Sequence, residues 1–254
     1  MQARFEVVDL QLKTNTLLAI DSALEHLLDM LRLNRGDNQG VRSLVPALYL
    51  RLNRDQECYD FVKWWVTTGQ ESKYEWGNPE FPYLDVKDAD AFEDVDGLFY
   101  GRKHMQNNYK IAATLIKIRV LIDLKRLLKC KQEAAPDVEK EVFRDTFSDG
   151  TLSDIVVRYP KIWDAGEGVA DPEPYIGMIK GQIKNMYKAV EEGNQYFWKT
   201  LVSPGDSLRF KPGMYIPGDR TEVNIEMQYW YNAWVETPGA IGIVEELVKG
   251  GKVV

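Results

Sequence analysis

Apolar residues recur at helical spacing along most of the chain. In residues 19–33 the apolar positions are separated by steps of three, one and four, a stripe typical of a helix with one buried face. The same reasoning predicts helices over 39–52, 55–65, 103–131, 136–147, 173–201, 220–235 and 238–249. Pro46 is expected to kink the helix over 39–52. No period-two alternation is long enough to require a sheet, so we predict an all-α fold.

The pattern divides one α-helical domain, residues 1–254, into consecutive parts. Repeat-like helical pairs occupy 1–68, an acidic and aromatic loop 69–102, long helices 103–201, a linker 202–219 and two closing helices 220–249. A loop of this length inside a compact domain is usually functional or disordered. The loop is therefore the first place to look for a binding function.

The first helices have the spacing of a tetratricopeptide repeat, whose period is about 34 residues. Ala23 and Cys58 occupy equivalent small positions, and large apolar residues follow each of them four and seven positions on. Pro46 stands where the repeat places a small glycine. Two partial matches are fewer than the three repeats that a stable stack usually needs. The spacing predicts tetratricopeptide-like antiparallel helix pairs, with no recognisable continuation beyond residue 70.

Three stretches together carry a more specific resemblance. They are LLDMLRLNRGDNQGVRSLVPALYLRLNRDQECYDFVKWWVTTGQ, YLDVKDADAF and YNAWVETPGAIGIVEELVK. The chain resembles, over most of its length, the helical tetratricopeptide-like region of fungal proteins that also carry a MYND-type zinc finger. This resemblance implies a protein-interaction scaffold. A MYND finger needs about eight Cys and His ligands, whereas this chain has two of each, so it is expected to lack the finger.

The negative charge is concentrated in one segment. The chain has 32 basic and 39 acidic residues, and residues 71–100 contain nine acids and two bases. This composition disfavours nucleic acid as a partner, because binding phosphates needs a basic face. No run reaches the roughly 18 apolar residues that a membrane span needs, and two cysteines suit a reducing compartment. We expect a cytoplasmic or nuclear protein that binds no membrane and uses no cofactor.

The densest aromatic and acidic residues are the candidate binding residues. They are Trp64, Trp65, Trp76, Phe81, Tyr83, Asp88, Asp90, Glu93 and Asp94. Aromatic anchors beside carboxylates could hold a basic protein or peptide segment. Two alternatives stay open: the tryptophans could be core residues, and the loop could fold over its own basic helix at 110–131.

Catalytic and metal signatures are weak. His26 and His104 are interpreted as structural or surface histidines, and Cys58 is expected to be a buried, inert thiol. No metal site is predicted. The sequence therefore favours a non-catalytic scaffold that binds a protein or peptide through an aromatic groove and the acidic loop. The alternative is an all-α enzyme or small-molecule-binding protein with a hydrophobic pocket between helices.

Overall fold

A computed structural model of the protein describes residues 2–99, 106–135, 137–164 and 168–253. These residues form α-helices and short 3-10 turns, and no strand occurs within those ranges. The α-helices are α1 (Gln2–Thr14), α2 (Leu17–Leu33), α3 (Val45–Arg51), α4 (Asp55–Val66), α5 (Asn107–Glu133), α6 (Lys140–Ser148), α7 (Asp154–Arg158), α8 (Pro160–Trp163), α9 (Glu173–Gly193), α10 (Phe197–Val202), α11 (Arg220–Val235) and α12 (Ala240–Val248). The all-α prediction is confirmed.

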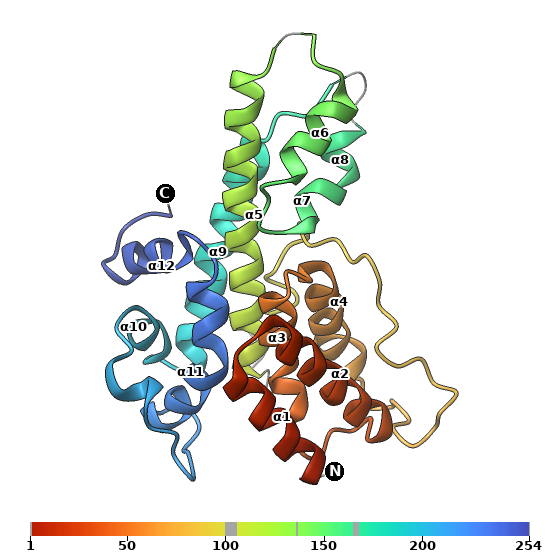
Figure 1. The fold of residues 1–254 in the computed structure, drawn as a ribbon, viewed down its shortest axis with the longest axis vertical. Helices are drawn as coiled ribbons and strands as arrows, with labels where there is room; N and C mark the ends of the chain where they lie inside the picture. The colour runs from red at the N-terminus through yellow and green to blue at the C-terminus, as the bar shows by residue number, and fades with distance from the viewer. Residues whose placement is uncertain (1, 100–105, 136, 165–167, 254) are drawn as a thin grey trace.

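The other helices are arranged around α5. In Figure 1, α1 to α4 lie beside the lower part of α5, α6 to α8 lie beside its upper part, and α9 to α12 lie on the opposite side. Buried apolar residues from α1 through α12 belong to one continuous core cluster. Tetratricopeptide-like pairing of α2, α3 and α4 stays a prediction.

Helix α5 is buried on all sides over its first half. Every residue from Tyr109 to Leu121 is buried, whereas the sequence predicted one apolar side. A helix surrounded by other helices is buried on every face. Its polar residues must then find partners within the protein, because an unpaired buried polar group is costly.

Arg119 shows how α5 meets this requirement. Its guanidinium donates to an oxygen of Asp55 and to the carbonyl oxygen of Leu50, each at 2.8 Å, and its Nε donates to Thr237 Oγ1 at 2.9 Å. The Arg119 and Asp55 side chains are 2% and 0% exposed. Burial raises the pKa of Asp55 to about 6 even though Arg119 favours its ionised form. One side chain of α5 therefore joins the start of α4 to the corner between α11 and α12.

Several helix boundaries differ from the predicted ones. The range 39–52 is a 3-10 turn at Val41–Ser43 followed by α3, and Pro46 lies in the first turn of α3. Proline is favoured there because the amide it lacks has no helical partner, so it kinks nothing. The predicted helix 173–201 ends at Gly193. Asn194 then accepts from the amide of Tyr196 and donates to the carbonyl of Asp219.

Three helices lie where the sequence predicted none: α1, α7 and α8. In α1 only Val8 is buried, so the helix has almost no apolar stripe. Helices α7 and α8 are five and four residues long, too short for a periodic pattern. Within the described ranges, no helix combines the length and apolar character needed to cross a bilayer.

Candidate partner-binding cleft

The acidic segment folds as an ordered band along the protein. We call residues 71–99 the acidic strap; it is the long yellow segment without helices that follows α4 in Figure 1. It contains no regular helix or strand. Its path is fixed instead by aromatic packing, by side chains that bind its backbone, and by ion pairs.

The first part of the strap packs on the two adjacent tryptophans of α4. Trp64 and Trp65 are both 0% exposed. Trp76 stacks on Trp65 with ring centroids 5.7 Å apart, and Tyr83 meets Trp64 edge to face at 5.0 Å. The Trp64 Nε1 donates to Asp85 at 3.1 Å. These positions fit the core-packing alternative for Trp64 and Trp65, which form the base on which the strap lies.

The half-buried aromatic residues of the strap, Trp76, Phe81 and Tyr83, lie outside this base. Trp76 also lines a shallow hollow of about 590 Å³ together with Arg35. Arg35 donates to the carbonyl oxygens of Asn78 and Phe81, each at 2.9 Å, and of Pro79 at 2.8 Å. Guanidinium donors can satisfy several acceptors at once. Arg35 thus fixes the outermost turn of the strap.

The middle of the strap is held by Asp60 on α4. Its two carboxylate oxygens accept from the backbone amides of Asp88 and Ala89, each at 2.9 Å. Gln56, one helical turn earlier, donates to Asp60 and to the Ala89 carbonyl, each at 3.0 Å. Leu84 and Asp88 both have φ near +51°, so the chain turns sharply at each end of the stretch 84–88.

The last part of the strap crosses α5. Lys117 of α5 is 0% exposed, and its ammonium donates to the carbonyl oxygens of Ala91 at 2.5 Å and Glu93 at 3.3 Å. Burial lowers the pKa of Lys117 to about 7. The Glu93 carboxylate accepts from Tyr59 Oη at 2.8 Å and from the Lys63 ammonium. The strap therefore does fold over the basic helix predicted at 110–131, but it contacts Lys117 through carbonyl oxygens.

The acidic side chains of the strap pair with bases from other helices. Asp88 pairs with Arg158 of α7 at 2.5 Å, Asp90 pairs with Lys161 of α8 at 3.8 Å, and Glu93 pairs with Lys63 of α4. The other six acids have no ion pair with any described residue, and all are exposed: Glu71, Glu75, Glu80, Asp85, Asp94 and Asp96. The strap thus keeps an outward-facing negative charge.

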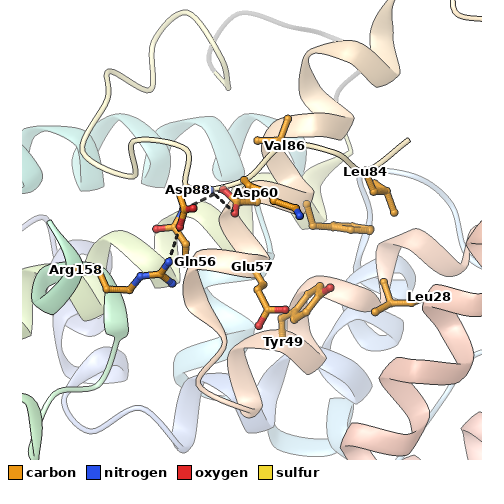
Figure 2. Close-up of a pocket in the computed structure, with 11 residues that line it drawn as sticks. Leu28, Tyr49, Gln56, Glu57, Asp60, Leu84, Val86, Asp88 and Arg158 are labelled. Atoms are coloured by element: carbon orange, nitrogen blue, oxygen red, sulfur yellow. Dashed lines mark hydrogen bonds and ion pairs between the residues drawn. The ribbon is translucent and has the colours of Figure 1, made fainter. Parts of the chain in front are cut away.

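A cleft of about 430 Å³ opens between α2, α4, α7 and residues 84–88 of the strap. Figure 2 shows Asp88, Asp60, Gln56 and Arg158 gathered at one end of this cleft. Its apolar lining residues are Leu28, Tyr49, Phe61, Leu84 and Val86. Its charged lining residues are Glu57, Asp60, Lys87, Asp88 and Arg158. The cleft therefore combines an apolar floor with a charged rim.

Two carboxyl groups of the cleft have pKa values shifted in opposite directions. Burial raises the pKa of Asp60, although the amides of Ala89 and Asp88 oppose the shift. A hydrogen bond from Arg54 lowers the pKa of Glu57. The described lining residues include no Ser, Cys or His. The arrangement suits binding of a ligand that has both apolar and charged groups.

Two further sequence expectations concern chemistry. Cys58 is 0% exposed, its thiol faces the Pro46 carbonyl at 3.5 Å, and burial raises its pKa, so it is the buried thiol that was predicted. His26 is half-buried, and His104 lies outside the described residues. Among the described residues, no group of three or more His, Cys, Asp or Glu side chains could hold a metal ion.

The cleft residues Gln56, Asp60 and Arg158 were absent from the predicted site. Gln56 and Asp60 are four residues apart on a helix, so their common face could have been inferred from spacing. Arg158 lies 70 residues from its partner Asp88, and no sequence pattern signals that pairing. Comparison with protein-family models, curated proteins and solved structures found no match. The resemblance to MYND-associated helical proteins therefore stays a prediction.

Proposed function

We propose that this protein is a non-catalytic helical scaffold that binds a basic segment of a protein partner along the acidic strap and in the adjoining cleft. The observation that carries this proposal is the surplus of exposed carboxylates on a strap that the fold holds in place. Tying the strap to α4 and α5 fixes these charges beside an apolar floor. A cytoplasmic or nuclear location belongs to the same proposal.

The two parts of the surface have different roles. Exposed ion pairs contribute only about 0.2–1 kcal/mol each, so the carboxylates mainly attract and orient a basic segment. Affinity comes from burying apolar side chains, at about 25 cal/mol per Å², against Leu28, Phe61 and Val86. Trp76, Phe81 and Tyr83 offer half-buried aromatic surface beside the cleft, while Trp64 and Trp65 support them from beneath.

The preferred partner segment has lysine or arginine next to large apolar residues. Asp88 is the carboxylate best placed to receive such a base, because its side chain is 71% exposed and it lines the cleft. Its present partner Arg158 also pairs with Asp154 at 3.0 Å. Arg158 can therefore release Asp88 to an incoming base and keep an ion pair of its own.

The test uses a random peptide display library and a charge-neutralised strap. The variant D88N/D90N/D94N keeps the size of each side chain and leaves Glu93 intact, because Glu93 binds Tyr59 and Lys63. We expect peptides selected by the native protein to be rich in Lys or Arg beside apolar residues. Their affinity for the variant should fall about tenfold at low salt and less at high salt.

The matched control is D137N/E139Q/E141Q, which removes the same number of charges from exposed positions at the start of α6. It should bind the selected peptides like the native protein. Equal losses in the two variants would assign the effect to net charge alone. Selection of peptides without basic residues would contradict the proposal.

A further inference from the structure

A second cavity, of about 350 Å³, lies between α1, the start of α5 and α11. Its walls include the aromatic rings of Phe5, Tyr215 and Tyr229 and the carboxyl groups of Glu222 and Glu226. It has no lining residue in common with the cleft beside the strap. The proposal made for that cleft leaves this cavity without a role.

Glu226 sets this cavity apart. The residue is 6% exposed, and its Oε2 is buried with no hydrogen-bond partner. No described residue forms an ion pair with it. A buried charge is normally paired or hydrogen-bonded, because leaving it unpaired costs several kcal/mol. Buried Asp55, Lys117 and Arg119 all follow that rule, and Glu226 does not.

The surroundings of Glu226 are acidic and aromatic. Glu222, one turn earlier on α11, accepts from Asn194 and from the Gly218 amide. No lysine, arginine or histidine occurs among the described residues that line the cavity. Lys211 contacts the hydroxyl of Tyr229 at 2.8 Å, but it is not a lining residue, and it also pairs with Asp9.

The mouth of the cavity is apolar and exposed. Tyr215 lines the cavity and is 53% exposed, and its neighbours Met214 and Ile216 are 88% and 66% exposed. A ligand that enters here could bury part of this apolar surface. Aromatic faces also attract cations. Glu226 Oε2 is thus an acceptor without a donor, beside the rings of Phe5 and Tyr215. The Tyr229 ring already has the Lys211 ammonium 5.1 Å from its centroid, so it offers mainly apolar contact.

We propose that this cavity binds a small organic ammonium ion, with the charged nitrogen at Glu226 and the carbon skeleton against Phe5, Tyr215 and Tyr229. Asn108 has its oxygen engaged by Trp230 Nε1 at 2.7 Å, and Glu222 already accepts from Asn194 and the Gly218 amide. Glu226 Oε2 has no partner, so the proposal assigns the ammonium protons to Glu226. The ligand supplies the counter-charge that the described residues leave out.

Protons link ligand binding to pH. Burial, followed by the charge of Glu222, raises the pKa of Glu226 to about 8, so the free protein holds a proton there at neutral pH. The other titratable lining residues are Tyr215 and Tyr229, on the 215 segment and α11; α1, the turn at 39–44 and α5 contribute only uncharged lining residues. An ammonium ion must expel the proton from Glu226. Affinity should therefore rise about tenfold per pH unit up to that pKa and then level off.

The test measures three probes of similar shape and different charge by isothermal titration calorimetry: phenethylammonium, 2-phenylethanol and phenylacetate. The cation should bind the native protein most tightly and release a proton, detected by repeating the titration in buffers with different ionisation heats. Butylammonium and cyclohexylmethylammonium are titrated as well, so that an ammonium ion whose carbon skeleton differs from that of phenethylammonium is also tested. If no ammonium probe binds, or if the neutral alcohol binds as tightly as its cationic analogue, the proposal is wrong.

The variants locate the charge. E226Q keeps the shape of the side chain and should lower affinity for the cation tenfold or more, abolish the proton release, and leave 2-phenylethanol unchanged. Y215A, at an exposed position, should weaken the cation and the alcohol alike. D88N, in the cleft beside the strap, should change neither. Equal cation affinity for E226Q and the native protein would contradict the proposal, whereas peptide binding by the strap is independent of E226Q.

Discussion

Arg119 on α5 and Glu226 on α11 are both buried ionisable side chains, and the fold treats them in opposite ways. Arg119 is 2% exposed and donates to a carboxylate, a carbonyl and a hydroxyl. Glu226 is 6% exposed and has no such partner among the described residues. The first arrangement connects helices that are distant in sequence. The second makes no such connection among the described residues, and the proposed ammonium site rests on that observation.

The comparison extends to the strap. Lys117 ties the strap to α5 through two carbonyl oxygens, as Arg119 ties α4 to the α11–α12 corner. The polar residues of α5 therefore organise the molecule, and the strap surface that they position is where a partner is proposed to bind. Under the two proposals, stability and binding depend on different residues along the strap and on the same residue at Glu226.

The largest loss of stability is expected for R119M. Asp55 would remain buried without its counter-charge, which costs about 3–5 kcal/mol of the free energy of unfolding. Urea denaturation measures that loss. The double variant D55N/R119M leaves neither charge buried, so its loss should be smaller than the sum of the two single losses. Strictly additive losses would show that Arg119 and Asp55 do not act as a pair.

E226Q should raise the free energy of unfolding, whereas R119M lowers it. The folded-state pKa of Glu226 is raised to about 8, so the native protein loses stability as pH rises from the ordinary glutamate value through about 8. Glutamine carries no charge at any pH. The variant should match the native protein near pH 4 and exceed it well above pH 8 by on the order of 5 kcal/mol. Urea denaturation at several pH values checks this, and a pH-independent difference would contradict it.

Much of this fold can be predicted from periodicity. The ranges expected for α2, α4, α11 and α12 agree with the structure to within about two residues, because each has an apolar stripe or a clear end signal. Helix α1 was missed because its side chains are largely exposed, so burial leaves no pattern in its sequence. The end of α9 was missed because Asn194, the residue after its last turn, donates to the carbonyl oxygen of Asp219. Only the tertiary structure creates that contact.

The candidate sites could also be predicted only in part from the sequence. The composition of the strap identified it as a separate segment, but its bases Arg158 and Lys161 come from two short helices that no pattern predicted. Glu226 could have been found. It lies three residues after Val223 and four before Trp230, on the buried stripe of α11, where a charged residue is rare.

A smaller effect is expected for K117M, and it should be local. Methionine fills the space of the lysine stem but donates nothing to the carbonyl oxygens of Ala91 and Glu93. The strap amides should then exchange about tenfold faster, equivalent to about 1.4 kcal/mol of local opening. Hydrogen–deuterium exchange measures this. K110M is the matched control, because Lys110 donates to Ala189 of α9 instead; equal acceleration in both variants would rule out a specific tie.

The smallest effect is expected for D88N. The Asp88 and Arg158 side chains are 71% and 51% exposed, and exposed pairs contribute about 0–1 kcal/mol. The backbone amide of Asp88 still donates to Asp60 in the variant, so the turn persists. The free energy of unfolding should therefore fall by less than about 1 kcal/mol, and by less still in high salt. A loss as large as that of R119M would mean that the strap's outward charges hold the fold together, and binding and stability could no longer be separated there.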